Sequence, residues 1–367
     1  MKRNTFCGEN VSRLGMGNMR LPTLADGSID YISAEAIIDK LYSAGVNYFD
    51  TAYVYHHGES EAFLGKALKK YPRDSFYVAT KYNCRANPDY KAVFEEQLSR
   101  LDMDRIDFYL LHAVSDGTID TYLTNGCVEY FLEQKFLGRI RHLGFSFHGS
   151  IDTLHKVLAA HTWDFAQIQF NYLDYLEFDA RAQYEIITSK NIPIVVMEPV
   201  RGGRLASLTP ETNMELKSVH RCRSIASWAF RFVMGFDNAK VVLSGMSTIE
   251  QAEDNILTFR YDDALSAEER DLLFSVCEMF KKEISAPCTA CKYCVDGCPM
   301  GINIPEMMTV YNKYKLNGKG ALRAFENCEH SAVDCVGCGA CSVQCPQNID
   351  IPALMSDMSA AYETLKK

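Results

Sequence analysis

The alternation of short apolar runs with longer amphipathic stretches most constrains how this 367-residue chain can fold. The intervening stretches, such as Ser33–Ala44, Glu59–Lys70, Lys91–Leu101 and Asp152–Ala160, carry apolar residues three and four positions apart, which is typical of helices with one buried face. The apolar runs are rich in Val, Ile, Leu, Phe or Tyr, as expected of strands buried on both faces. There are eight of them between about residues 13 and 260: Arg13–Asn18, Asn47–Ala52, Phe76–Lys81, Ile106–His112, Ile140–Phe147, Phe165–Asn171, Ile192–Pro199 and Lys240–Met246.

Eight strand–helix units in about 250 residues are the number and length of a closed (β/α)8 barrel. A doubly wound open sheet is the alternative, but it favours fewer units and a glycine-rich phosphate loop after the first strand. Here Gly15-Met16-Gly17 is followed by Asn18-Met19-Arg20, so the dinucleotide-binding fingerprint is incomplete. The sequence therefore predicts an α/β protein with a TIM barrel at residues 1–285, whose last helix spans Ala267–Glu283.

The C-terminal part, residues 286–367, has a different organisation, because nine of the fourteen cysteines lie there. The pattern C-x2-C-x2-C-x3-C-P occurs twice in it with an offset of 47 residues, and each copy is followed by Ile-Asn-Ile-Pro or Ile-Asp-Ile-Pro. Such self-similarity indicates an internal duplication. Proline after Ile304 and after Ile351 suits the first turn of a helix. We therefore expect a small, mostly helical second domain.

Both copies have the cysteine spacing of bacterial ferredoxins that hold two [4Fe–4S] clusters, in which the cysteine before proline ligates the other cluster. Zinc is the alternative, since C-x2-C pairs also form zinc sites, but four cysteines and a proline in each copy favour iron–sulfur. The long segment between the copies resembles the helical ferredoxin modules appended to larger enzymes. Cys328, outside both motifs, is expected to be a plain buried thiol. The expected ligand sets are Cys288, Cys291, Cys294 and Cys345 for one cluster, and Cys335, Cys338, Cys341 and Cys298 for the other.

Charge and hydropathy exclude several classes of partner. The formal net charge is −9, and two clusters with four thiolates each would add about −4, so nucleic acid and anionic membranes are poor partners. No apolar run approaches the roughly 18 residues that a membrane span needs, and the N-terminus lacks the apolar core of an export signal. We therefore expect a soluble, cytoplasmic protein whose thiols stay reduced.

Three polar residues end three successive predicted strands, and a fourth lies in the loop after the first of them. Barrel enzymes carry their chemistry at these strand ends. They are Asp50, Lys81 and His112, together with Tyr55 in the loop after the first of these strands. Reduction of a carbonyl requires a hydride on carbon and a proton on oxygen. The ammonium of Lys81, held in place by Asp50, would favour the phenolate of Tyr55. Tyr55 would then be the general acid in reduction, and His112 would orient the carbonyl.

At these positions the chain resembles the aldo-keto reductase family, over about residues 5–275. The resemblance implies a nicotinamide cofactor at the barrel mouth and a small carbonyl substrate. Ser146 and Gln167 align with the residues that hold the carboxamide, although Phe147 replaces the family's asparagine and Met197 its ring-stacking aromatic residue. The segments that carry the resemblance are Asp50-Thr51-Ala52-Tyr53-Val54-Tyr55, Glu59-Ser60-Glu61, Leu64-Gly65-Lys66-Ala67-Leu68, Ala79-Thr80-Lys81 and Asp107-Phe108-Tyr109-Leu110-Leu111-His112.

The same resemblance implies where the rest of the cofactor binds. Gly245 and Gln251 stand where NADPH-specific members place a Lys and an Arg, and neither can pair with a phosphate as a guanidinium can. This favours NADH over NADPH, although Lys240 or Arg260 could still supply charge. Met197 and Pro199 would lie beside the nicotinamide and Arg201, Gly202 and Gly203 beside the pyrophosphate, while the adenosine end would be bound by Ser244, Gly245, Met246, Gln251, Asp254 and Asn255.

The two halves of the chain leave three functions open, because a nicotinamide gives two electrons as hydride whereas a cubane takes one at a time. The first is a carbonyl reductase whose clusters are structural or sense oxidation. The second is a reductase whose clusters exchange electrons between a ferredoxin-like partner and the barrel. The third is a non-catalytic redox-sensing or scaffold subunit. The intact set of four residues favours the first; direct exchange would need a mediator such as flavin, for which no motif is visible.

Overall fold

The structure is a computed structural model that describes residues 1–261 and 263–365, and it contains two compact units. The barrel unit comprises Met1–Val200 and Ala226–Arg270, and the cysteine-rich unit comprises Arg201–Ile225 and Asp271–Lys367. The segment Arg201–Ile225 thus groups with the C-terminal part of the chain, although it follows the seventh predicted strand. The division at residue 285 stays a prediction.

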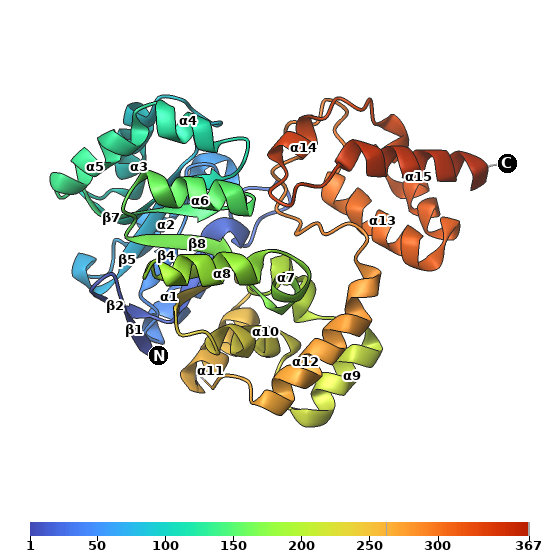
Figure 1. The fold of residues 1–367 in the computed structure, drawn as a ribbon, viewed down its shortest axis with the longest axis horizontal. Coiled ribbons are helices and arrows are strands. Elements are labelled where there is room, and N and C mark those ends of the chain that lie inside the picture. The colour runs from blue at the N-terminus through green and yellow to red at the C-terminus, as the bar shows by residue number, and fades with distance from the viewer. Residues whose placement is uncertain (262, 366–367) are drawn as a thin grey trace. The chain divides into compact units, whose positions relative to one another are not determined.

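Eight parallel strands close the barrel in the order β10-β3-β4-β5-β6-β7-β8-β9 (Figure 1), which confirms the predicted architecture. Each predicted apolar run overlaps one strand, although β5, β6 and β10 extend one or two residues beyond the predicted ends. The interior is filled by large side chains from neighbouring strands, among them Tyr48, Phe108 and Phe165, all fully buried. The strands are β3 (Leu14–Gly17), β4 (Tyr48–Asp50), β5 (Tyr77–Tyr82), β6 (Ile106–Val114), β7 (Ile140–Phe147), β8 (Phe165–Gln169), β9 (Ile194–Met197) and β10 (Ala239–Ser244).

A hairpin that the sequence analysis did not predict precedes the barrel. Its strands β1 (Arg3–Phe6) and β2 (Glu9–Ser12) pair antiparallel around a turn at Cys7 and Gly8, both with positive φ. Phe6 is fully buried and stacks on Phe108 with a centroid distance of 4.8 Å. The hairpin therefore adds an apolar side chain to the barrel interior near the strand N-termini.

Helices surround the barrel strands (Figure 1). Several begin at side chains that accept a backbone N–H, which satisfies a donor at the helix start: Asp30 for α1, Asp89 for α3 and Ser150 for α6. The helices and short 3-10 turns of this part are η1 (Asn18–Arg20), α1 (Tyr31–Ser43), η2 (Tyr55–Gly58), α2 (Glu59–Leu68), η3 (Arg73–Ser75), α3 (Tyr90–Leu101), α4 (Ile119–Thr124), α5 (Cys127–Phe136), α6 (Ile151–Ala160), α7 (Tyr172–Glu177), α8 (Ala180–Ser189), α10 (Ile225–Met234), α11 (Ile249–Tyr261) and α12 (Ala267–Phe280), the last continuing into the cysteine-rich unit.

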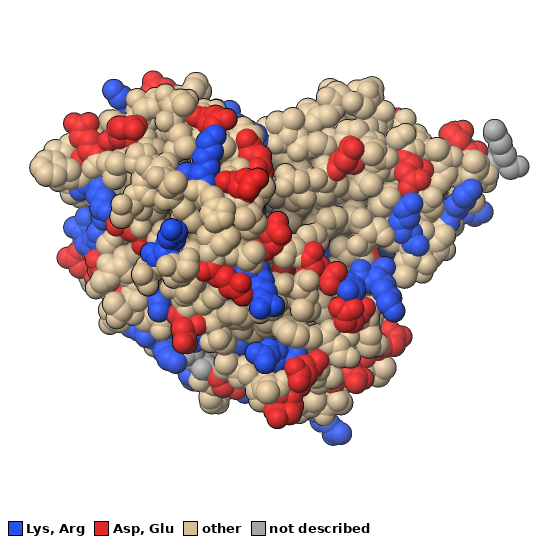
Figure 2. Space-filling model, in the orientation of Figure 1, with Lys and Arg blue, Asp and Glu red and all other residues tan. Residues whose placement is uncertain are grey.

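The cysteine-rich unit is helical, as expected. Its two longer C-terminal helices each start with Ile-Pro, one in each repeat, and pack through Met307, Met308, Met355 and Met358, all essentially fully buried. Among the described residues, no helix is both long and apolar enough to cross a membrane. On the visible face of the molecule, acidic and basic side chains are interspersed (Figure 2). The elements of this unit are η4 (Arg201–Ala206), α9 (Pro210–Val219), η5 (Lys281–Glu283), α13 (Ile304–Asn317), η6 (Lys319–Asn327), η7 (Ala332–Asp334), α14 (Ala340–Gln344) and α15 (Ile351–Leu365).

Candidate active site and cysteine cavities

A buried ion pair lies at the C-terminal ends of β4 and β5. Lys81 Nζ donates to Asp50 Oδ1 at 2.5 Å and to the carbonyl oxygen of Thr51 at 2.6 Å. Both charged side chains are almost completely inaccessible to solvent. Burial lowers the pKa of Lys81 and raises the pKa of Asp50, and their mutual attraction opposes both shifts. The carboxylate is therefore what allows a charged lysine to exist inside the barrel.

Tyr55 and His112 lie next to this pair. Lys81 Nζ is 5.0 Å from the centroid of the Tyr55 ring, and the His112 ring lies edge-on to Tyr55 with a centroid distance of 5.8 Å. Burial, together with the charge of Lys81, lowers the pKa of His112 well below its usual range, so its imidazole is neutral at pH 7. A neutral imidazole can still donate one hydrogen bond. The structure thus brings together the four residues singled out from the sequence.

A second buried carboxylate, which the sequence analysis did not single out, belongs to a hydrogen-bond network that includes the backbone of Lys81. Glu61 on α2 accepts hydrogen bonds from Thr80 Oγ1 at 2.5 Å, Gln97 Nε2 at 2.7 Å and Arg100 at 3.3 Å. Gln97 on α3 also donates to the backbone oxygen of Lys81 at 3.0 Å. These bonds fix α2 and α3 to β5 beside the ion pair. A sequence signal existed, because Glu61 shares a helical face with the leucines three and seven positions later, and a charge on a buried face needs partners.

Backbone strain accumulates at this end of the barrel. Non-glycine residues rarely adopt left-handed φ; each costs about 1–3 kcal/mol and persists only where the surrounding structure imposes it. Such residues directly follow three of the predicted site residues: His56 and His57 after Tyr55, Ala113 after His112, and Glu198 after Met197. The strain therefore coincides with the strand ends that carry the candidate chemistry.

The residues expected to hold the nicotinamide carboxamide differ in how they are engaged. Gln167 on β8 donates through Nε2 to the sulfur of Met197 at 3.5 Å, and its buried Oε1 has no hydrogen-bond partner within the described residues. Such an oxygen can accept an amide N–H, so this position fits a carboxamide. The Ser146 hydroxyl accepts from the backbone N–H of Ala113 at 2.8 Å and is thus engaged in the barrel wall.

The residues expected at the adenosine end lie at the end of β10, in the loop that follows it and on α11, and hydrogen bonds join several of them. Asn255 Nδ2 donates to Ser244 Oγ at 2.8 Å, and Gln251 Oε1 accepts from the backbone N–H of Ser247 at 2.7 Å. Met246 is fully buried and anchors the loop, whereas Asp254 is half-buried on α11. The side chain of Gln251 is therefore used to shape the loop.

An arginine that the sequence analysis did not select lies beside this loop. A Cβ at Gly245 would meet the Arg20 side chain at 3.1 Å, so any larger residue there would require that side chain to shift. Arg20 also forms an ion pair with Glu198 at 3.4 Å. The aliphatic part of the Arg20 side chain therefore lies against Gly245, and its guanidinium is at Glu198.

The turn predicted to bind the pyrophosphate is hydrogen-bonded to residues near two of the motif cysteines. Arg201 is almost fully buried, and its guanidinium donates to the carbonyl oxygen of Pro287 at 3.0 Å and to Gln347 Oε1 at 3.2 Å. Gly202 and Gly203 follow with φ of +65° and +92°, a turn that glycine adopts readily, and Pro199 is buried just before it.

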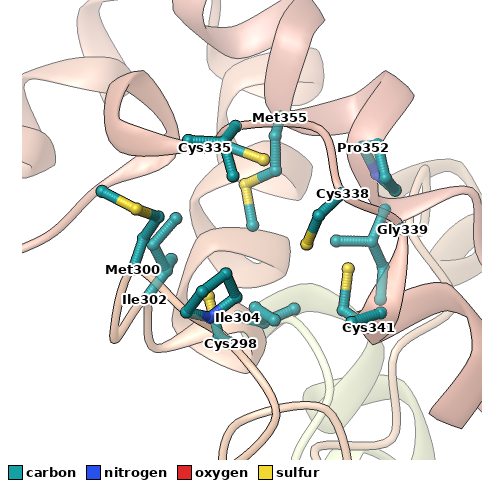
Figure 3. A pocket seen from close by; sticks show the side chains of 14 residues that line it. Cys298, Met300, Ile302, Ile304, Cys335, Cys338, Gly339, Cys341, Pro352 and Met355 are labelled. Atoms are coloured by element: carbon teal, nitrogen blue, oxygen red, sulfur yellow. The ribbon is translucent and has the colours of Figure 1, made fainter.

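The eight motif cysteines line two cavities of the cysteine-rich unit. Figure 3 shows the sulfur atoms of one set around a shared space, with Met300 and Met355 beside them. The sulfurs are spread around each space, and within the part of the chain that the structure describes no three candidate ligands are close enough to hold a single ion. Cavities lined by thiols in this way fit a polynuclear cluster. Cys298, Cys335, Cys338 and Cys341 border one cavity, and Cys288, Cys291, Cys294 and Cys345 border the other; the empty space, part of it open to solvent, is about 360 Å³ and about 330 Å³.

Comparison with known proteins assigns a family model to each part of the chain. The model described as the aldo/keto reductase family matches residues 13–273, and the model described as a 4Fe-4S dicluster domain matches residues 284–349. Residues 13–273 contain the four-residue site, and residues 284–349 contain all eight motif cysteines.

Individual relatives match part of the chain. A probable aldo-keto reductase of Glycine max is 32% identical over 175 residues, which are 45% of this chain and 49% of that protein. The chain thus spans about half the length of this relative. L-galactose dehydrogenase of Arabidopsis thaliana is 26% identical over 289 residues, covering 72% of this chain and 89% of that protein. The solved aldo-keto reductase AKR11C1 from Bacillus halodurans, in its holo form, is 29% identical with a TM-score of 0.62, covering 75% of this chain and 96% of that one.

Proposed function

The chain belongs to the aldo/keto reductase family and is an NAD(P)-dependent oxidoreductase of that kind, and we propose that it reduces the carbonyl of a small aldehyde, ketone or sugar to an alcohol. Its C-terminal part is a 4Fe–4S ferredoxin-like domain, so both resemblances inferred from the sequence are confirmed. The observation that carries the proposal is the buried Lys81–Asp50 pair, whose ammonium lies 5.0 Å from the Tyr55 ring.

The proposed roles follow from this geometry. A nicotinamide, bound with its carboxamide at Gln167, supplies the hydride. Tyr55 donates its phenolic proton to the carbonyl oxygen as the alcohol forms, and the nearby ammonium of Lys81 favours the phenolate that remains. Asp50 keeps Lys81 charged in the barrel interior. Neutral His112 donates a hydrogen bond to the carbonyl oxygen and orients it. In the oxidative direction the Tyr55 phenolate accepts the proton.

The nicotinamide cofactor is proposed to be NADH. Gly245 carries no charge, and Gln251 is used to hold the backbone of Ser247. Arg20, the cation beside Gly245, is already paired with Glu198. A 2′-phosphate would therefore have to compete with a carboxylate for its guanidinium, which disfavours NADPH. A lower KM for NADH than for NADPH in steady-state assays is expected; the reverse preference would contradict this part of the proposal.

The test of the catalytic proposal compares two tyrosines of one loop. Tyr55→Phe should lower carbonyl reduction by about 10²–10⁴-fold, because the general acid is lost. Tyr53→Phe is the matched control, since the Tyr53 hydroxyl donates to Glu96 at an exposed position. The assay follows NADH and NADPH oxidation anaerobically with a panel of aldehydes, ketones and sugars, and the iron–sulfur absorbance should be the same in all variants. Full activity of Tyr55→Phe would show that the assigned acid is wrong.

We further propose that the cysteine-rich unit binds two [4Fe–4S] clusters, one in each cavity. The support is the grouping of the linings, in which three close cysteines of one repeat meet the Cys-Pro cysteine of the other. Iron and sulfide analysis of anaerobically reconstituted protein should give about eight of each per chain. A value near four iron atoms per chain would mean that only one cavity binds a cluster, which would contradict the proposal.

Electron exchange with a ferredoxin-like partner is the second candidate function. Cys338, which lines the larger cavity, is exposed, and its neighbour Val336 is 62% exposed. The surface over α14 carries few charged side chains in the visible face (Figure 2). A cluster there would lie close to solvent, as exchange between proteins requires. EPR spectra recorded anaerobically with NADH and then with reduced ferredoxin, together with turnover measured under both conditions, separate the two candidates, because only the second predicts that reduced ferredoxin reduces the clusters and that turnover depends on it.

A further inference from the structure

Arg201 joins the two chain segments that supply ligands to one of the proposed clusters. Its two acceptors, the Pro287 carbonyl oxygen at 3.0 Å and Gln347 Oε1 at 3.2 Å, flank Cys288 and Cys345 in the sequence. These cysteines are 57 residues apart, yet line the same cavity. One guanidinium therefore bridges both sides of the cavity.

A second arginine adds positive charge at the same place. Arg204 lies three residues further along η4 and is half-buried. Burial lowers the pKa of Arg204, the charge of Arg201 adds to this effect, and Cys288 opposes it. Arg204 lies on the same short turn as Arg201, whose guanidinium is hydrogen-bonded to both ligand-bearing segments. The turn that contacts both sides of this cavity therefore carries two guanidinium groups.

The internal duplication provides a matched comparison within the same chain. An offset of 47 residues relates Gln347 to Met300 and Pro287 to Asp334. Met300 lines the other cavity and presents a thioether, which is a weak acceptor compared with an amide oxygen. Asp334, directly before Cys335, brings a carboxylate that accepts the backbone N–H of Ser331 at 2.8 Å. The cavities thus differ in charge: the first has Lys292 in its lining and Arg201 hydrogen-bonded to two of its bordering segments, whereas no charged side chain is among the described residues that line the second.

We propose that Arg201 and Arg204 form a cationic clamp that gives the cluster at Cys288, Cys291, Cys294 and Cys345 the higher reduction potential of the two. The inference rests on the proposed binding of two clusters. One-electron reduction takes a cubane with four thiolates from a charge of about −2 to about −3, and nearby positive charge stabilises the reduced form more than the oxidised one. A single electron taken up by the protein therefore resides on the clamped cluster.

The test is an EPR-monitored redox titration of the full-length, cluster-loaded protein with dithionite as reductant. Arg204→Gln should lower the ratio of reduced to oxidised clamped cluster about tenfold at a fixed potential, which for a one-electron couple corresponds to about 59 mV. The other cluster should be unchanged. Arg204→Lys keeps the charge and should restore the wild-type midpoint. Arg323→Gln, at an exposed position of the same unit, is the control and should shift neither midpoint.

Substitution of Arg201 separates the bridging role from the charge. Arg201→Lys keeps one positive charge but cannot donate to both acceptors as a guanidinium does. Chelators should therefore remove the clamped cluster several-fold faster from Arg201→Lys than from wild-type protein. Arg204→Lys should lose the cluster at the wild-type rate. Cys338→Ser, which changes a ligand of the other cluster only, identifies which EPR signal shifts.

The outcomes distinguish this inference from the function on which it rests. If wild-type protein binds about eight iron atoms and Arg204→Gln leaves both midpoints in place, the clamp is wrong. If the Cys338→Ser label shows that the other cluster is reduced first, the assigned order is wrong. If reconstituted wild-type protein shows no cubane signal, it is the proposed binding of clusters that fails.

Discussion

Replacement of Asp50 by Asn should expose how much the barrel depends on its buried ion pair. Opposite charges 2.5 Å apart attract each other by about 6–7 kcal/mol at an effective dielectric constant of about 20. Asn keeps the shape and a hydrogen-bond acceptor, so part of this interaction survives. Removal of one partner of a buried pair typically costs about 3–5 kcal/mol, and we expect a loss of that size in the free energy of unfolding at pH 7.

The pH dependence of this loss follows from the direction of the Lys81 shift. Burial already lowers the pKa of Lys81 in the folded protein, and Asp50 opposes that effect. Without the carboxylate the folded-state pKa of Lys81 falls further below its value in the unfolded chain. The unfolded variant then binds more protons than the folded one, so its stability rises with pH. The deficit of Asp50→Asn should therefore shrink from pH 7 to about pH 9.

Urea unfolding followed by tryptophan fluorescence measures the barrel selectively. Both tryptophans, Trp163 and Trp228, are buried in the barrel unit. The double variant Asp50→Asn/Lys81→Met removes both charges and should recover at least about 2 kcal/mol of the loss. A double variant no more stable than Asp50→Asn would refute the account in which an uncompensated ammonium causes the destabilisation.

Three further predictions concern packing, titration and the clusters. A Cβ at Gly144 would lie 2.5 Å from the backbone oxygen of Phe165, so Gly144→Ala should cost about 1–3 kcal/mol or more in urea unfolding, whereas Gly17→Ala, with its nearest atoms at 3.7 Å, should cost under about 1 kcal/mol. Because burial lowers the pKa of His112 well below its usual range and that of His148 to about 4, neither imidazole should cause an inflection near pH 6.5 in the rate–pH profile; an inflection there that His112→Gln removes would argue against this. Anaerobic removal of iron should reduce the far-ultraviolet circular dichroism of the cysteine-rich unit, because the cysteines that line its two cavities lose the groups that join the two repeats, while the fluorescence of the barrel tryptophans stays constant.

The barrel could be predicted because its strands have a local signature. Strands buried on both faces are continuously apolar, so each of the eight runs stands out from the amphipathic helices around it. The β1–β2 hairpin was missed because its strands are only four residues long and mix polar with apolar side chains. Cys7-Gly8 was the available turn signal, since glycine readily adopts the positive φ found there.

The candidate site was predictable to the extent that strand order determines it. Asp50, Lys81 and His112 end successive strands, and successive parallel strands of a barrel lie side by side. The partners of Glu61 and Arg201 were not predictable in this way, because tertiary packing places them. Arg201 follows a barrel strand in sequence, and only the structure shows its guanidinium at Pro287 and Gln347.

The difference between the two repeats bears on why a hydride-transferring enzyme would carry one-electron centres. Clusters with a purely structural role need cysteines and packing, and these are the same in both repeats. What differs is the electrostatic environment: the turn with Arg201 and Arg204 at one cavity, and an exposed Cys338 with a lining that holds no charged side chain among the described residues at the other. An electron that enters at the exposed cluster would therefore move towards the clamped one. Two clusters that each accept one electron together hold two electrons, the number carried by a hydride, but a nicotinamide delivers both electrons at once, so exchange with the barrel would still require a mediator such as a flavin.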